Sequence, residues 1–202
     1  MMLVAIEAGA QKPQLQIVLP DRAGLATEPP SVRSVSLLSD EAMRNLLVNG
    51  FPARLHYRME RWTTGGWFDD IKAAVEWDVV VKYDALGKRY HVFRAFGNRA
   101  TELGSYATLN EAQEIVDIPF RAPISLPRRG QKSYYNVVLD IETLSLTELD
   151  EVEQWLRGEV KPAVRGKKNP GTAMSRGMRT LVIRLLGGEK RRYEARSGTF
   201  RP

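Results

Sequence analysis

The chain has 202 residues, 43% hydrophobic and 27% charged, a balance that predicts a folded chain with a sizeable core. It contains no cysteine, which excludes disulfides, thiol nucleophiles and cysteine-based metal centres. The net charge of +6 is uneven, because residues 1–157 hold 18 Lys/Arg against 21 Asp/Glu and residues 158–202 hold 12 against 3. Such a basic segment predicts contact with an anionic partner.

The first ten residues resemble the end of a secretory signal peptide. The run MMLVAIEAGA ends in Ala-Gly-Ala, which predicts cleavage after Ala10. The run is short, contains Glu7 and follows no basic residues, so a frayed or strand-forming terminus is the alternative. We interpret 1–10 as a signal-peptide remnant, 11–157 as a β-sandwich domain and 158–202 as a basic tail with an amphipathic helix and a final strand.

Hydrophobic alternation predicts most of the strands. Short strands are expected at 14–19 and 32–38, followed by a helix that begins after Ser39 as N-cap and ends at Asn49-Gly50. Period-two alternation then predicts half-buried strands of an antiparallel sheet. These strands are expected at 51–61, 72–84, 89–96 and 132–142.

Two capping boxes predict further helices. Thr108-Leu-Asn-Glu111 opens a helix to about Val116, and Ser145-Leu-Thr-Glu148 opens one that ends near Gly158. Prolines between 119 and 127 indicate an irregular or edge segment, and 190–200 is expected to form the final strand. The fold class is therefore mainly β, an antiparallel β-sandwich or open barrel with two or three short helices.

The connection RWTTGGWFDD at 61–70 is rich in aromatic residues and leaves two interpretations open. Trp62, Trp67 and Phe68 could form a contact with a partner, since exposed aromatic side chains suit interfaces. Alternatively, Trp62 or Trp67 caps the core beneath, as large aromatics at sheet ends are often half buried.

The basic tail predicts a second contact. Arg176, Arg179 and Arg184 lie beside an apolar stripe of helical spacing, and the cations Lys190, Arg191 and Arg192 follow. This pattern favours an anionic membrane surface. Nucleic acid is the rival partner and is disfavoured, because no recognisable nucleic-acid-binding motif occurs and the aromatics lie mostly outside the basic segment. The alternative to a membrane contact is a helix that packs on the core, with its arginine side chains extending into solvent.

The sequence offers little catalytic chemistry. No G-x-S-x-G nucleophile elbow occurs, and the glycines at 166 and 171 lack the lysine of a phosphate loop. The carboxylate pairs Asp69-Asp70 and Glu151/Glu153 are interpreted as solvated charge. We expect no enzymatic activity and no cofactor.

The two histidines, His56 and His91, both fall on predicted strands. A zinc site would need further ligands such as Asp78 or Asp84, and no spacing points to one. Two strand histidines without a metal are therefore favoured.

Five segments in order resemble a bacterial family of exported proteins, the domain of unknown function numbered 4390. They are LLVNGFP at 46–52, RW and WFDD within 61–70, VKYDALGKRYHV at 81–92, YATLNEA at 106–112 and YNVVLD at 135–140. The resemblance covers about residues 30–145 and departs at Asp84, where the family often has His, and at Leu144-Ser145, where it has Leu-Pro. It implies a β-rich envelope protein with a signal peptide, and it supplies no catalytic residues.

These observations predict a non-enzymatic periplasmic protein, peripheral to the membrane. It would act as an accessory or scaffold subunit docked on a membrane-bound complex, for example a respiratory or photosynthetic one. The alternative is a periplasmic β-sandwich that encloses a small apolar ligand such as a lipid. Four aromatic residues would line that cavity: Tyr57, Trp77, Tyr83 and Tyr90.

Overall fold

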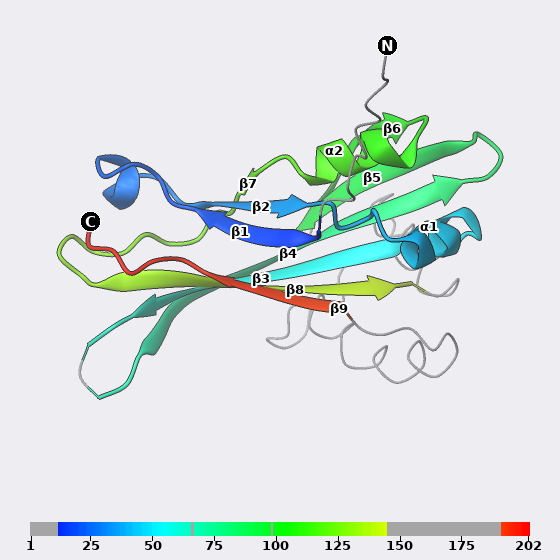
Figure 1. Ribbon diagram of the computed structural model, residues 1–202. Helices are drawn as coiled ribbons and strands as arrows, with labels where there is room; N and C mark the ends of the chain where they lie inside the picture. Colours follow the sequence, from blue (N-terminus) through cyan, green and yellow to red (C-terminus); the bar gives the residue numbers. More distant parts are fainter. Residues whose placement is uncertain (1–11, 66, 98, 145–190) are drawn as a thin grey trace, which may run out of the picture.

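The computed structural model describes residues 12–65, 67–97, 99–144 and 191–202, which form two antiparallel sheets stacked face to face (Figure 1). The larger sheet has the order β6-β5-β4-β3-β8-β9, and the smaller has the order β1-β2-β7. The strands of the larger sheet are β3 (Ala53–Thr63), β4 (Asp70–Asp84), β5 (Arg89–Phe96), β6 (Arg99–Tyr106), β8 (Ser133–Thr143) and β9 (Arg191–Arg196). Those of the smaller sheet are β1 (Gln14–Val18), β2 (Ser31–Val35) and β7 (Phe120–Arg121). The predicted mainly β class is confirmed.

The hydrophobic core lies between the two sheets, because one face of each long strand is apolar. Strand β3 buries Leu55, Tyr57 and Met59 against this core, and the alternate residues point to the other face. Burying a side chain of this size stabilises the fold by about 1.5–3 kcal/mol. The larger sheet therefore has a core face and an outer face, the latter turned away from the smaller sheet.

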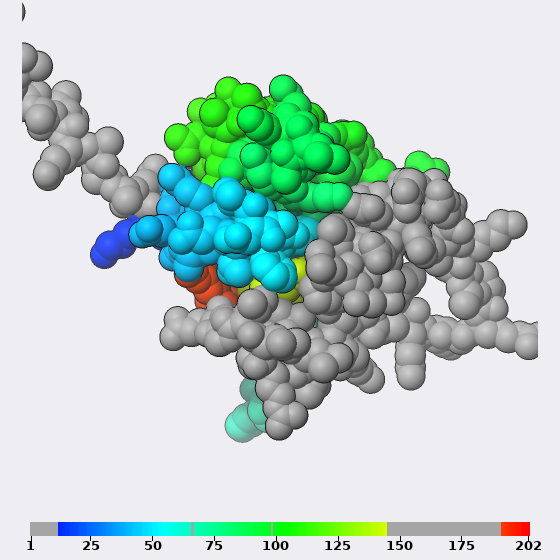
Figure 2. All heavy atoms as spheres, turned by 90° about the vertical axis from the view of Figure 1, so that its right-hand side faces the viewer, coloured from blue at the N-terminus to red at the C-terminus, as the bar shows by residue number. Residues whose placement is uncertain are grey.

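Two short α-helices occur in the described residues, α1 (Glu41–Val48) and α2 (Leu109–Val116). Helix α1 (cyan) and the segment from β5 to α2 (green) form the surface at one end of the molecule (Figure 2). The capping box of α2 is confirmed, since Thr108 and Glu111 bond each other's backbone amides. The N-cap of α1 is Asp40 rather than Ser39, because the Asp40 carboxylate accepts from two amides of the first turn, while the Ser39 hydroxyl donates to the Ser36 carbonyl.

Strand β6 was not predicted, since its sequence RATELGSY lacks clear alternation. Gly104 explains part of this irregularity, because its φ of +142° is unfavourable for residues with a side chain. Strand β2 ends earlier than expected, at Val35, because Ser36 adopts a φ of +56°. The final strand is present as β9 and pairs with β8, so this part of the expected tail belongs to the larger sheet.

Strand β4 extends well beyond its neighbour β5. The ladder between them begins at the pair Trp77 and Phe96, whereas β4 itself begins at Asp70. Residues 70–76 therefore pair only with β3 among the described strands. The β3–β4 hairpin consequently projects from one end of the sandwich (Figure 1).

Candidate functional site

Two aromatic side chains stand in water at the tip of the β3–β4 hairpin. Trp67 is 97% exposed and Phe68 is 85% exposed, in the connection between Thr63 and Asp70. The core-capping interpretation is therefore wrong for Trp67, because the connection reaches past the end of the core. We call Trp67 and Phe68 the hairpin tip.

Trp62 has a different role from the tip residues. It continues the outer face of β3 and lies parallel to the ring of Tyr134 on β8, with the centroids 6.0 Å apart. Its indole N–H donates to Glu60 at 3.0 Å. Trp62 thus caps no core and forms part of the hairpin stem; the sequence grouped it with the tip because the three aromatics are close along the chain.

Tyr134 is the centre of the contacts that hold the stem. Its hydroxyl donates to the Asp69 carboxylate at 3.0 Å, and the Arg196 guanidinium lies 3.7 Å from its ring centroid. Arg196 also lies 3.9 Å from Asp69. We call Trp62, Asp69, Tyr134 and Arg196 the stem clamp, since they join β3, β8, β9 and the connection.

Backbone pairing supports the stem as well. The β3–β8 ladder continues to Thr63 opposite Ser133, and the Thr64 amide donates to the Lys132 carbonyl at 2.9 Å. The connection is therefore anchored immediately before the tip. A backbone anchored close to the tip loses less freedom on binding than a free one, which favours binding.

The charges around the tip balance. Asp69 faces Arg196, and Asp70 accepts a hydrogen bond from Lys72. Each carboxylate of the connection thus has a cation beside it. The two acidic residues thus form ion pairs rather than an acid/base couple.

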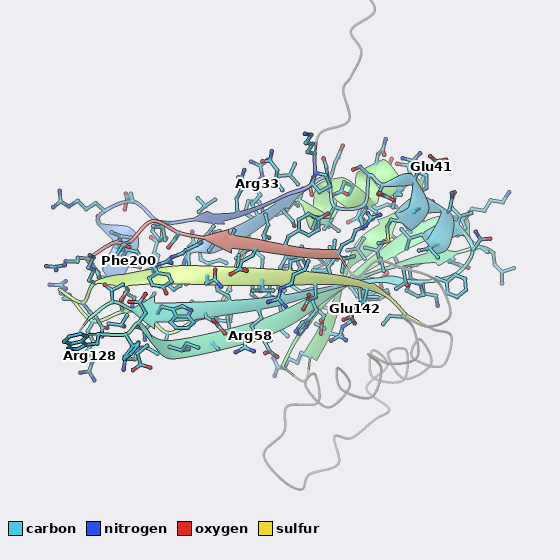
Figure 3. The ribbon with its side chains drawn as sticks, turned by 60° about the horizontal axis from the view of Figure 1, so that its bottom comes forward. Arg33, Glu41, Arg58, Arg128, Glu142 and Phe200 are labelled. Carbon is cyan, nitrogen blue, oxygen red and sulfur yellow. The ribbon has the colours of Figure 1, made fainter. Side chains whose placement is uncertain are left out.

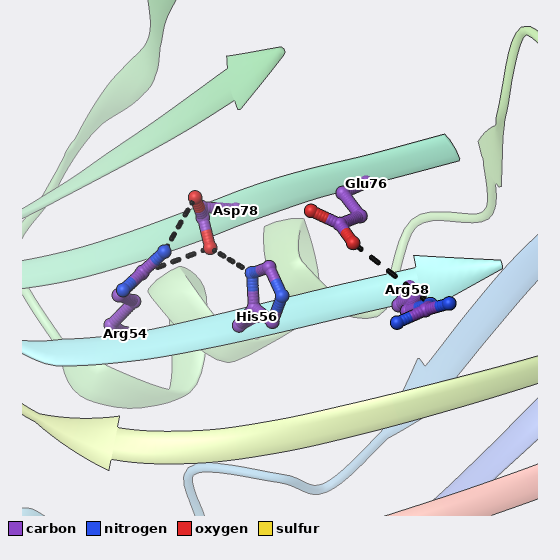
Figure 4. A network of polar contacts seen from close by, with 5 residues as sticks. All are labelled: Arg54, His56, Arg58, Glu76 and Asp78. Carbon is purple, nitrogen blue, oxygen red and sulfur yellow. Dashed lines mark hydrogen bonds and ion pairs between the residues drawn. The ribbon is translucent and has the colours of Figure 1, made fainter. Parts of the chain in front are cut away.

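A second polar cluster lies on the outer face of the larger sheet (Figure 4). Arg54 donates to both oxygens of Asp78, at 2.9 and 3.1 Å, and the His56 Nδ1 lies 2.8 Å from Asp78 Oδ1. Arg54 is only 4% exposed. Burial raises the pKa of Asp78, but the hydrogen bonds from His56 and Arg54 and the charge of Arg54 outweigh it, so the pKa lies below its ordinary value.

The rest of this face carries further ion pairs, which are weaker because they are more exposed. Arg58 contacts Glu60 at 2.7 Å and Glu76 at 3.9 Å. Figure 3 shows Arg58 and Glu142 on this face, on the side of the molecule opposite Arg33. Charged neighbours on adjacent strands are typical of a solvated sheet face.

The histidines do not meet, because β4 lies between their strands. His91 instead lies 2.9 Å from Glu102 on β6. In the described part of the chain, no group of three or more His, Cys, Asp or Glu side chains is placed to hold a metal ion. His56 with Asp78 forms a polar pair, while Asp84 bonds the Leu86 amide.

The expected anionic-surface residues are only partly described. Arg176, Arg179, Arg184 and Lys190 lie outside the described residues, as do Glu151 and Glu153. Arg191 pairs with Asp40 at 2.8 Å, and Arg192 stands opposite Asp140 in the β8–β9 ladder. Arg191 thus already has a carboxylate partner, which makes it a poorer contact for an anionic surface than the sequence indicated.

The four aromatics of the apolar-cavity alternative pack against one another. Tyr57 stacks on Trp77 with the ring centroids 4.9 Å apart, and the ring centroids of Tyr83 and Tyr90 are 4.8 Å apart. Phe120 adds a further ring against Trp77 at 5.2 Å. This packing makes the rings part of the core and gives little support to a cavity that they would line.

Comparison of the chain with protein-family models, curated proteins and solved structures finds no match. The resemblance to the exported family over residues 30–145 therefore stays a hypothesis. No helix in the described part of the chain is long and apolar enough to span a bilayer.

Proposed function

We propose that this protein is a non-enzymatic accessory or scaffold subunit of the bacterial periplasm. It lies peripheral to the membrane and docks on a membrane-bound complex, of which a respiratory or photosynthetic assembly is an example. The hairpin tip is its docking element. The periplasmic location is supported by the resemblance to an exported family and by the signal-like residues 1–10.

The observation that carries the proposal is the exposure of Trp67 and Phe68 on a braced stem. Leaving two large aromatic side chains in water forgoes the stabilisation that burial gives, about 1.5–3 kcal/mol for a side chain such as Phe. The stem clamp joins the connection to the outer face of the sheet next to the tip. Aromatic residues of this kind are the usual anchors of binding surfaces.

The apolar-ligand alternative has less support, because Tyr57 and Trp77 fill the core with their own stack. Native mass spectrometry of the purified chain distinguishes the two functions. A retained lipid of constant mass would favour the ligand binder, whereas the docking function predicts the mass of the chain alone.

The proposal is tested by co-purification from detergent-solubilised bacterial membranes. We expect the tagged full chain to elute with a larger membrane complex, and the Trp67→Ser/Phe68→Ser variant to elute alone. Leu86→Ser is the matched control, because Leu86 is 97% exposed at the opposite end of β4. Recovery of the unmodified chain only as a free monomer contradicts the proposal.

A further inference from the structure

We propose that the hairpin tip inserts into the boundary between headgroups and acyl chains of a lipid bilayer, without preference for anionic lipid. The inference rests on the proposed function and names the surface that the tip meets. In this arrangement the tip enters the lipid that borders the complex at the place where the protein docks.

The size of the tip favours lipid over protein. Trp67 and Phe68 together offer about 300–500 Å² of surface, taking roughly 150–250 Å² for each aromatic side chain. A stable protein interface buries about 800 Å² on each partner. Ile71 on the adjoining strand is also exposed, at 43%. A bilayer needs no matching surface, since binding scales with the apolar area that enters it.

The shape of the hairpin also favours lipid over protein. Residues 70–76 of β4 pair only with β3 among the described strands, so the hairpin stands clear of β5 (Figure 1). A narrow projection can enter a soft interface to the depth of its end side chains. Tryptophan is moreover enriched at membrane interfaces, where its ring lies at the level of the headgroups.

The charge of the hairpin end determines the lipid preference. Asp69 is compensated by Arg196, and Asp70 by Lys72. A connection whose charges are paired in this way gains little attraction from anionic headgroups, whose pull acts on uncompensated cations. The tip is therefore expected to bind zwitterionic lipid, and to do so with little dependence on salt.

The test is sedimentation of the full chain with protein-free vesicles of phosphatidylcholine. We expect the chain to bind, the Trp67→Ser/Phe68→Ser variant to lose about tenfold or more in affinity, and Leu86→Ser to bind like the unmodified chain. Vesicles with added phosphatidylglycerol form a second arm. The loss on changing the tip should be of the same fold there, whatever the rest of the chain adds.

Three outcomes overturn the inference. If the chain ignores phosphatidylcholine but binds bacterial membranes through Trp67 and Phe68, the tip meets protein, and the proposed function stands. If changing Trp67 and Phe68 weakens binding only on vesicles with phosphatidylglycerol, the tip prefers anionic lipid and the inference is wrong. If the chain binds neither vesicles nor bacterial membranes, both the inference and the proposed function fail.

Discussion

Trp62 on β3 stacks against Tyr134 on β8 with their ring planes 4° apart, and Tyr134 in turn binds Asp69 through its hydroxyl. One pair of rings thereby connects the outer face of the sheet to the connection that carries the tip. The exposed aromatics are for this reason presented on a braced support. A contact element on a braced stem loses less freedom when it binds than one on a free loop.

The stem clamp makes a prediction about Tyr134→Phe. This change keeps the ring stack and removes the hydrogen bond to the Asp69 carboxylate, which is worth roughly 1.5–3 kcal/mol for a bond to a charged group. We expect faster hydrogen exchange at the Thr64 amide, which donates to the Lys132 carbonyl, and weaker membrane binding, although Trp67 and Phe68 are intact.

Tyr83→Phe is the control for this experiment, since its hydroxyl has no hydrogen-bond partner in the described part of the chain. It should change neither the exchange of the connection nor binding. Equal exchange rates in Tyr134→Phe and the unmodified chain would show that the clamp does not order the connection.

The outer-face cluster makes a prediction about stability. Asp78→Asn removes the carboxylate that accepts two hydrogen bonds from the buried Arg54, and breaking a buried ion pair costs about 3–5 kcal/mol. Asp78 is 20% exposed, so we expect about 2–3 kcal/mol in urea unfolding at neutral pH. Glu76→Gln is the control; its partner Arg58 is half exposed, and the pair should contribute no more than about 1 kcal/mol.

The same variant has a defined pH dependence. Because the folded state holds the pKa of Asp78 below its ordinary value of 3.8, the stabilisation is present above that pH and is lost as the pH falls below it. The difference between the unmodified chain and Asp78→Asn should therefore shrink on acidification. A difference that stays constant below pH 3.8 would contradict the assignment of the effect to this carboxylate.

The buried Tyr135 makes the stability of the fold depend on pH in the alkaline range. Burial raises the pKa of Tyr135 to about 12, against a smaller opposing effect of Arg61. Its contribution to stability is thus complete below pH 10 and is lost as the pH rises toward 12. We expect Tyr135→Phe to flatten this decline in unfolding experiments. A decline of equal steepness in Tyr135→Phe would assign it to other groups.

Much of the fold could be predicted from alternation alone. Strand β5 was predicted at its observed bounds, because Tyr90 and Val92 alternate with polar residues. Alternation also excludes Trp62 from the core, because Trp62 has the parity of the outer-face residues Arg58 and Glu60. Strand β6 could not be found in this way, since Gly104 interrupts its pattern.

The stem clamp could not be predicted, since it depends on the order of the strands. Tyr134 lies opposite Trp62 only because β8 pairs with β3, and Arg196 reaches the same ring only because β9 pairs with β8. These residues are far apart in the sequence. The exposure of Trp67 likewise depends on where β5 ends relative to β4.

Burial of the hairpin tip at the membrane is measured most directly with a fluorescent label, since the chain has no cysteine of its own. Phe68→Cys is labelled with an environment-sensitive dye and mixed with bacterial membranes, alongside Leu86→Cys. We predict a blue shift and a gain of intensity for the label at position 68 and none for that at 86. A bound chain whose label at 68 stays in water, or equal shifts at both positions, would contradict docking through the tip.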